Sequence, residues 1–144
     1  WILLYKVVNA GFPWPLGAFE NKRSFCSIQN VCFVVKQLLE QPVESGIYNL
    51  ADDEALSTNT LVEIIADCLG NKAKIWKFGR TLMTFLAKFG DRLHLPLTTE
   101  RLGKLTENYI VDNSKIKRAL SIDKMPLSAR EGLSYTIRCF NRDK

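Results

Sequence analysis

The chain has 144 residues, of which 47 % are hydrophobic and 24 % are charged, and its formal net charge is +5. This composition allows a packed core and excludes a wholly disordered chain, and the length fits one ordinary domain. Because the lysines and arginines are spread along the sequence, we expect neither nucleic acid nor a membrane as a partner. A local site for a small anion remains open.

The first segment, WILLYKVV, is apolar but too short to span a bilayer, and it lacks the charged start and cleavage site of a signal peptide. We expect it to be the back half of a helix that ends at Gly11. Residues 11–19 are rich in proline and glycine and predict a loop. A short apolar run, Phe25–Ile28, predicts a strand, and Arg23 lies just before its start.

An amphipathic helix is predicted from Asn30 onward, because apolar residues recur with helical spacing until Pro42 and Gly46 end the pattern. These residues are Val31, Val34, Val35, Leu38 and Leu39. The run GIYNLA at 46–51 then predicts a buried strand.

A second helix is predicted to be capped by Ser57 and closed by Gly70. Its core face comprises Leu61, Ile64, Ile65, Cys68 and Leu69.

The remaining elements are mostly helical. AKIWKF at 73–78 predicts a short strand, and a helix over Leu82–Phe89 is expected to stop at Gly90. Further helices are expected at 97–105, from Asp112 or Asn113 to Leu120, and after Ser128, which has capping-box spacing to Glu131. Strands alternating with helices, followed by helices alone, indicate an α/β fold with an appended helical subdomain.

Four cysteines stand at 26, 32, 68 and 139 without any CxxC pair, and His94 is the only histidine, so no zinc site is predicted. All four lie in apolar patterns, which predicts buried free thiols in a reducing compartment such as the cytoplasm. His94, between two leucines, is expected to be packed or interfacial. Asp52, Asp53 and Glu54 are interpreted as a solvated loop that complements the dipole of the following helix.

Three segments carry a family resemblance: RSFCSIQNV at 23–31, SGIYNLADDEALSTNTLVEIIADCLG at 45–70 and YIVDNSKIKRALSIDKMPLSAREGL at 109–133. In this order and spacing they resemble the C-terminal part of extended short-chain dehydrogenase/reductases. The nearest group is the NAD-dependent nucleotide-sugar epimerase/dehydratase family, of the UDP-glucose 4-epimerase type. Gln29 and Asn30 depart from it, because the family has an acidic pair there.

The resemblance implies that residues 1–144 form the C-terminal substrate-binding portion of such an enzyme, mostly helical with a few short strands. Residues 20–70 would then be a strand-helix-strand-helix part that joins the cofactor-binding sheet. Residues 71–144 would form a helical substrate lobe. The implied substrate is a UDP-sugar, and NAD would be bound by the N-terminal half of the full-length enzyme.

Arg23 occupies the place where the family's arginine contacts the diphosphate of the nucleotide sugar, and a guanidinium suits phosphate oxygens well. The alternative is a surface arginine paired with Glu20 or Glu40. Asn21 is a further candidate donor to a phosphate or ribose, although a turn-forming asparagine is as consistent with the pattern.

Two other places complete the implied site. The loop where the family holds the uracil ring, largely through main-chain groups, corresponds to Leu16, Gly17, Ala18 and Phe19, and the alternative there is an ordinary turn. A second arginine and an aspartate of the family fall at Leu102 and Leu105. Arg101 lies one residue before the first of them and is therefore included.

The family's catalytic and cofactor motifs are missing from these residues. The eight glycines form no GxGxxG or GxxGxxG, and no lysine follows any of the four tyrosines four residues later. We therefore predict no catalytic, cofactor-binding or metal-binding residue within the 144 residues, and we expect the chain by itself to be inactive.

Two alternatives to an epimerase remain: a dehydratase or reductase of the same family, or a non-enzymatic helical interaction or nucleic-acid-binding module. The last lacks aromatic residues interleaved with basic ones. We also expect a homodimer, because the helix at 30–41 and the strands beside it would lack part of their cover.

Overall fold

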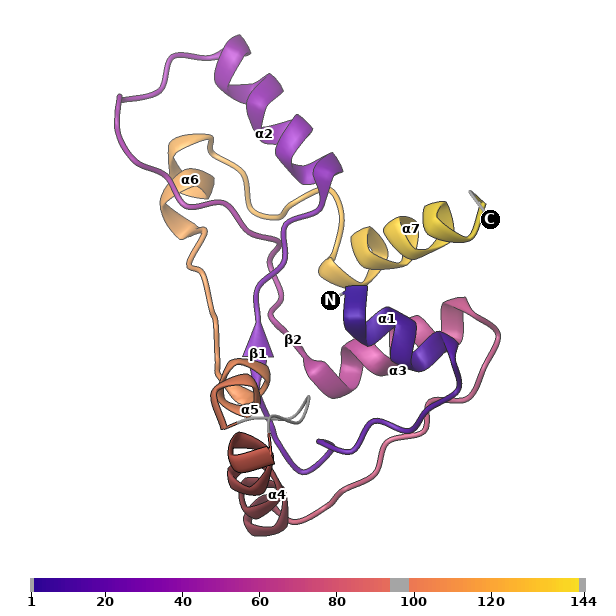
Figure 1. Ribbon diagram of the computed structural model, residues 1–144. Coiled ribbons are helices and arrows are strands. Elements are labelled where there is room, and N and C mark those ends of the chain that lie inside the picture. The colour runs from indigo at the N-terminus through magenta and orange to yellow at the C-terminus, as the bar shows by residue number, and fades with distance from the viewer. Residues whose placement is uncertain (1, 94–98, 143–144) are drawn as a thin grey trace. The chain divides into compact units, whose positions relative to one another are not determined.

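The computed structural model describes residues 2–93 and 99–142 (Figure 1). Within these ranges, helices dominate and two short strands form one two-stranded sheet. The chain divides into two compact units, each made of two segments. Unit 1 comprises Trp1–Lys22 and Ser57–Asn108, and unit 2 comprises Arg23–Leu56 and Tyr109–Lys144.

Unit 1 is built from two helix pairs. The helices α1 (Ile2–Asn9) and α3 (Thr58–Cys68) pack on each other, as do α4 (Arg80–Leu93) and α5 (Thr99–Thr106). The first pair buries the apolar face that the sequence predicts for α3. Its buried residues are Leu4, Tyr5 and Val8 of α1 and Leu61, Val62, Ile64, Ile65 and Ala66 of α3.

Both α1 and α3 end as the sequence predicts, at a glycine with a positive φ, +74° for Gly11 and +69° for Gly70. After α3, the N–H of Asn71 donates to Ala66 O at 2.9 Å and the N–H of Gly70 donates to Asp67 O at 3.1 Å. These two bonds form a Schellman motif, which satisfies the last carbonyls of the helix. At the other end of α3, the hydroxyl of Ser57 accepts from Thr60 N at 3.0 Å, so the predicted cap is confirmed.

Unit 2 contains α2 (Ile28–Glu40), α6 (Ser114–Ala119) and α7 (Ala129–Arg142). Its core joins the inner side of α2 to α6 and to the segment that follows α6, through Val34, Ile116, Leu120 and Met125. The predicted capping box of α7 is confirmed: Ser128 N donates to Glu131 Oε2 at 2.9 Å, and Glu131 N donates to Ser128 Oγ at 3.3 Å.

The strands are shorter than the sequence suggests. They are β1 (Lys22–Arg23) and β2 (Leu56–Ser57), which agrees with the expected fold of many helices and few short strands. The predicted strand at Phe25–Ile28 is wrong, because Ser27 caps α2 and Ile28 already belongs to the helix. The hydroxyl of Ser27 accepts from Asn30 N at 3.4 Å.

The predicted strand GIYNLA at 46–51 is also wrong, since the segment lies outside the strands of the described residues. Side chains hold it instead: Tyr48 donates from its hydroxyl to Glu44 O at 2.7 Å, and Lys115 donates to Ile47 O at 2.9 Å. The ammonium of Lys115 also lies 4.7 Å from the centre of the Tyr48 ring. Periodicity alone does not reveal that a β-type run lacks a neighbouring strand.

The helix predicted over 82–89 does not stop at Gly90 but continues to Leu93 in α4. A glycine inside a helix costs only about 1 kcal/mol relative to alanine, so it does not by itself end one. None of the helices in the described residues is both long and apolar enough to cross a membrane.

The prediction of buried thiols is wrong, although all four cysteines are free: Cys26, Cys32 and Cys139 are exposed and Cys68 is half-buried. Cys32 lies on a face of α2 opposite to the buried Val34, and the apolar pattern does not say which face is covered. His94 lies outside the described residues. The assignment of 20–70 to a cofactor-binding sheet and of 71–144 to a substrate lobe stays a prediction.

Candidate functional site

In unit 1, the loop implied to hold a uracil ring is fixed by backbone pairing with residues 74–77. Trp14 N donates to Lys74 O at 2.7 Å, Trp76 N donates to Trp14 O at 2.8 Å, and Gly17 N donates to Trp76 O at 3.0 Å. The predicted strand at 73–78 is thus reduced to isolated bridges at Ile75 and Lys77. This pairing holds residues 14–17 in one conformation.

Gly17 sits where no side chain fits. A Cβ at this position would lie 2.4 Å from Ile75 Cγ2 and 2.8 Å from the carbonyl oxygen of Trp76. Both of its backbone polar groups are bonded within unit 1, because its carbonyl also accepts from Asn59 Nδ2 at 3.0 Å. If the loop contacts a base through main-chain groups, those groups therefore belong to residues of the loop other than Gly17.

We expect Gly17→Ala to lower the free energy of unfolding by about 1–3 kcal/mol, because the added methyl group meets a backbone oxygen that cannot yield cheaply. Gly79→Ala is the matched control, since a Cβ there meets no atom within 4 Å. Chemical denaturation of both variants measures the difference. Equal stability of the two variants would contradict the assigned role of Gly17.

Arg80, at the start of α4, is a cation beside this loop that sequence reasoning missed. Its Nε donates to Ala18 O at 3.4 Å, and its guanidinium carbon lies 5.5 Å from the centre of the Phe19 ring. A cation over an aromatic face at an exposed site contributes about 0.5–1 kcal/mol. Phe19 and Arg80 lie 61 positions apart in the sequence, so no local motif reveals the pair.

Asn21 follows the loop, and its side chain is buried, with 1 % exposed. The next residue, Lys22, donates from its backbone N–H to Asn108 Oδ1 at 2.7 Å. Arg101 lies on α5 of the same unit. Four consecutive predicted residues, 16–19, thus share one loop, while Asn21 is placed inside the unit.

Arg23 belongs to unit 2, where it is half-buried in β1. Its backbone bridges to Tyr109, and Ser24 N donates to Tyr109 O at 2.8 Å. The N–H of Val111 closes the pairing by donating to Ser24 Oγ at 3.0 Å. Arg23 therefore lies on a strand whose backbone is paired on one side with residues 109–111.

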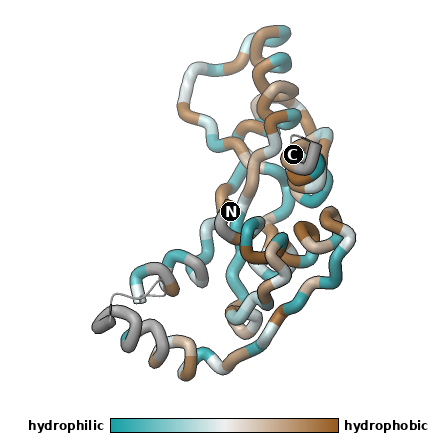
Figure 2. The backbone as a smooth tube through the Cα atoms, turned by 45° about the vertical axis from the view of Figure 1, so that its right-hand side comes forward, coloured by the Kyte–Doolittle hydropathy of each residue, from teal (hydrophilic) through white to brown (hydrophobic). Residues whose placement is uncertain are grey.

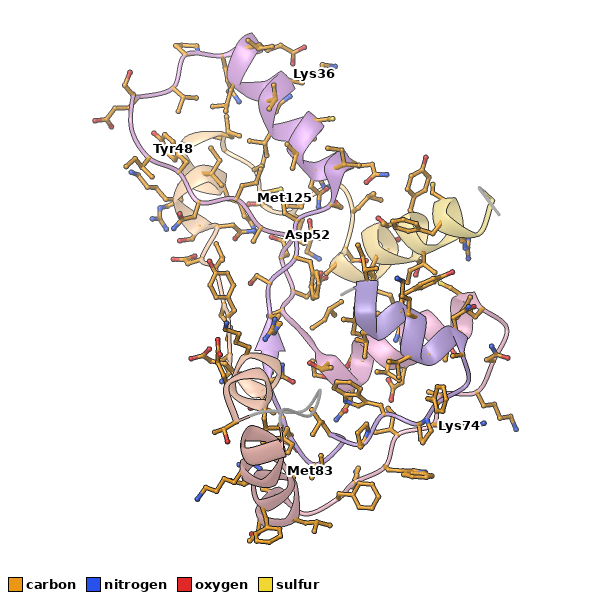
Figure 3. All side chains as sticks on the ribbon, in the orientation of Figure 1. Lys36, Tyr48, Asp52, Lys74, Met83 and Met125 are labelled. Atoms are coloured by element: carbon orange, nitrogen blue, oxygen red, sulfur yellow. The ribbon has the colours of Figure 1, made fainter. Side chains whose placement is uncertain are left out.

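For the acidic triplet of unit 2, the expectation of a solvated loop is wrong at Asp52, which is buried, whereas Asp53 and Glu54 are exposed. Asp52 is 4 % exposed, and its carboxylate accepts from Ser27 N at 3.0 Å, from Ser27 Oγ at 3.2 Å and from Asn30 Nδ2 at 2.7 Å (Figure 3). The same amide of Asn30 donates to Leu127 O at 2.8 Å, and its oxygen accepts from Leu127 N at 3.0 Å. Asp52 and Asn30 therefore join three segments.

Asp53 and Glu54 extend this arrangement. Asp53 forms a 2.7 Å ion pair with Lys117 and accepts from Met125 N at 2.8 Å and from Asn113 Nδ2 at 3.1 Å. Burial raises the pKa of Asp53, but the hydrogen bonds from these three residues and the charge of Lys117 outweigh it, so the pKa lies below its ordinary value. Glu54 accepts from Ala129 N at 3.0 Å, at the positive end of α7.

A cavity of about 300 Å³ lies in unit 1, outside the predicted site. Its lining includes Val8, Phe12, Val62, Lys72 and Lys74. The C-terminal ends of α1 and α3 border it, and helix C-termini carry partial negative charge. Lys74 donates to Gly11 O at 3.4 Å, just after the C-terminal end of α1.

No metal centre emerges from the described part of the chain, because no three of its histidine, cysteine, aspartate and glutamate side chains gather suitably. The carboxylates of the triplet at 52–54 instead accept hydrogen bonds from backbone and side-chain donors of unit 2. The described residues around the predicted site present cations, amides and main-chain polar groups.

No protein-family model matches the sequence, and no curated protein sequence matches it. Solved structures do match. UDP-N-acetylglucosamine 4-epimerase from Bacillus cereus is 20 % identical with a TM-score of 0.61, and the match covers 98 % of this chain and 42 % of that chain.

Two further enzymes match equally broadly. UDP-glucose 4-epimerase from Thermotoga maritima, solved with UDP-glucose, is 16 % identical with a TM-score of 0.59, covering 98 % of this chain and 38 % of that one. dTDP-glucose 4,6-dehydratase from Bacillus anthracis, solved with NAD, is 14 % identical with a TM-score of 0.60, covering 99 % and 38 %. The chain thus spans about two fifths of these enzymes and shares their fold over that length, which confirms the fold that the sequence resemblance implied.

Proposed function

We propose that residues 1–144 are the portion of an NAD-dependent sugar-nucleotide epimerase that binds the nucleotide-diphosphate sugar, of the UDP-glucose 4-epimerase type. The observation that carries the proposal is the match of 98–99 % of the chain to sugar-nucleotide epimerases and a dehydratase. One of these structures contains UDP-glucose.

Two features of the described residues support a role in binding rather than in catalysis. Arg23 is a permanent cation on a backbone that is paired on one side, and a guanidinium can fork onto the oxygens of a diphosphate. The loop Leu16–Phe19 is held by residues 74–77 and by Arg80. A preformed loop needs little ordering when a base binds to it, which lowers the cost of binding.

A dehydratase of the same family is the second candidate, and the match to dTDP-glucose 4,6-dehydratase favours it. Epimerases and dehydratases share this portion of the fold, so the described residues give the same binding role in both cases. NAD would be held by the part of a full-length enzyme that lies outside these 144 residues.

The test uses the longer polypeptide and the 144-residue chain side by side. We expect the longer polypeptide to bind NAD and to interconvert UDP-glucose and UDP-galactose, whereas the chain alone shows no saturable NAD binding in calorimetry and no activity. The reason is that the chain has no glycine-rich cofactor turn and no Tyr-x-x-x-Lys pair. Saturable NAD binding by the chain alone would contradict the proposal. If the longer polypeptide instead eliminated water from a nucleotide sugar, the dehydratase would be the correct member.

A further inference from the structure

Arg80 stands at a position that the chemistry of helices disfavours. It is the first residue of α4, and the start of a helix carries partial positive charge, which favours acidic side chains and not a cation. The first turn of α4 contains no acidic residue that would offset the charge. Positions where a side chain contradicts a local preference of this kind are often functional.

The segment between α3 and α4 brings Arg80 to the loop at 16–19. Polar and apolar residues alternate along this segment, as the teal and brown bands in Figure 2 show, and such alternation is typical of an extended chain that packs on one side. Lys77, whose backbone bridges to Leu16, precedes Arg80 by three residues. The backbone pairing of the loop therefore also fixes the point from which α4 begins.

Arg80 reaches the two loop residues that follow the backbone pairing at Gly17. Its Nε donates to Ala18 O at 3.4 Å, and its guanidinium carbon lies 5.5 Å from the centre of the Phe19 ring. The N–H of Phe19 in turn donates to Leu16 O at 3.0 Å. The peptide group between Ala18 and Phe19 is thus bonded through both its oxygen and its N–H, which fixes its orientation.

We propose that Arg80 is a positioning residue for the base of the nucleotide. It holds the peptide group between Ala18 and Phe19 in the orientation in which the loop accepts the base, and it does not itself contact the diphosphate. A loop that is already ordered loses little conformational freedom when a ligand binds, so a contact that orders it raises the affinity without touching the ligand. The inference rests on the proposed function, because it concerns the loop that would hold the base.

The test compares three ligands that share the base but differ in charge: uridine, UDP and UDP-glucose. In the longer polypeptide, Arg80→Ala is expected to weaken the binding of all three by the same factor, roughly threefold to tenfold, because the contacts that hold the loop are individually weak. Uridine has no phosphate. Weaker binding of UDP and UDP-glucose with unchanged binding of uridine would therefore mean a direct contact to the diphosphate and would overturn the proposal.

Lys88→Ala is the matched control, because it removes one positive charge from an exposed position on the same helix. Arg80→Lys should recover part of the affinity, since it keeps a cation near the ring but lacks the planar guanidinium. We expect KM for UDP-glucose to rise while kcat stays within about twofold, because the loop binds the base equally in the ground state and in the transition state. Circular dichroism checks that the variants keep their helices.

The contact with the Phe19 ring gives a second readout. If Arg80 acts through this ring, Phe19→Leu also weakens the binding of uridine, and the double variant weakens it by less than the product of the two single factors. A double variant that shows the full product would mean that the two side chains act independently, which would overturn the proposal.

The outcomes separate the role of Arg80 from the proposed function. If the parent polypeptide binds UDP-glucose, and Arg80→Ala binds it as tightly as Lys88→Ala does, the role of Arg80 is wrong and the proposed function stands. If the parent polypeptide binds none of the three ligands, the proposed function is wrong, and so is the role of Arg80 that rests on it.

Discussion

Asp52→Ala is expected to lower the free energy of unfolding by about 3–5 kcal/mol. The substitution removes the acceptor of Ser27 N, Ser27 Oγ and Asn30 Nδ2, which lie 2.7–3.2 Å from one carboxylate oxygen. Hydrogen bonds to a charged group contribute about 1.5–3 kcal/mol, and each buried donor left without a partner costs a further 1–3 kcal/mol. Asn30 is fully buried, so water cannot replace the lost acceptor without opening the unit.

Chemical denaturation followed by far-ultraviolet circular dichroism measures this effect. The matched control is Asp123→Ala, an exposed aspartate in the same unit, for which the change should stay within about 0.5 kcal/mol. Asn30→Leu tests the same network and is also expected to lower the free energy of unfolding strongly. It leaves Leu127 N–H without its acceptor and removes one donor to the Asp52 carboxylate. A loss below about 1 kcal/mol for Asp52→Ala would show that the carboxylate does not hold these segments together.

Arg23→Ala, made in the longer polypeptide, is expected to weaken the binding of a UDP-sugar roughly tenfold to a hundredfold. A charge-assisted contact of a guanidinium to a diphosphate contributes on the order of 1.5–3 kcal/mol, which corresponds to that range. Arg23→Lys should recover part of the affinity, since it restores the charge but not the forked geometry. The prediction rests on the proposed function.

Isothermal titration with UDP-glucose measures the dissociation constants. Lys22→Ala is the matched control, because it removes one positive charge from the neighbouring exposed position and should change the affinity little. If Arg23→Ala and Lys22→Ala bind UDP-glucose equally well, Arg23 has no specific role at the phosphates. The circular dichroism of both variants must match that of the parent protein for the comparison to hold.

The sequence predicts the helices well where local signals decide them. Ser57, Gly70 and the Ser128–Glu131 pair act within one helical turn, and each forms the predicted cap. Gly90 misleads because a glycine ends a helix only when the backbone needs a positive φ, and among the described glycines that conformation occurs at Gly11 and Gly70.

The errors concern contacts between residues far apart in the sequence. GIYNLA has the composition of a strand, but strand formation needs a neighbouring strand, which no local pattern reveals. Asp52 looks solvated because carboxylates usually are, and the sequence does not reveal the hydrogen bonds that Asp52, Asp53 and Glu54 accept. Their donors lie 22–75 residues away. The sequence does not predict the contact of Arg80 with Phe19 for the same reason, since only the fold brings the two residues together.

The division of the chain into two interleaved units has a consequence for its synthesis on the ribosome. Both segments of unit 1 have been made once residue 108 is added, whereas unit 2 still lacks Tyr109–Lys144. Until that segment emerges, Asp53 and Glu54 have none of the donors that they use in the finished protein, Lys117, Met125 N and Ala129 N among them. During this interval residues 23–56 connect the two segments of unit 1 but lack the rest of unit 2, so α2 and its apolar faces remain uncovered. A pause in translation after residue 108 would prolong this vulnerable interval, and chaperone demand should peak there.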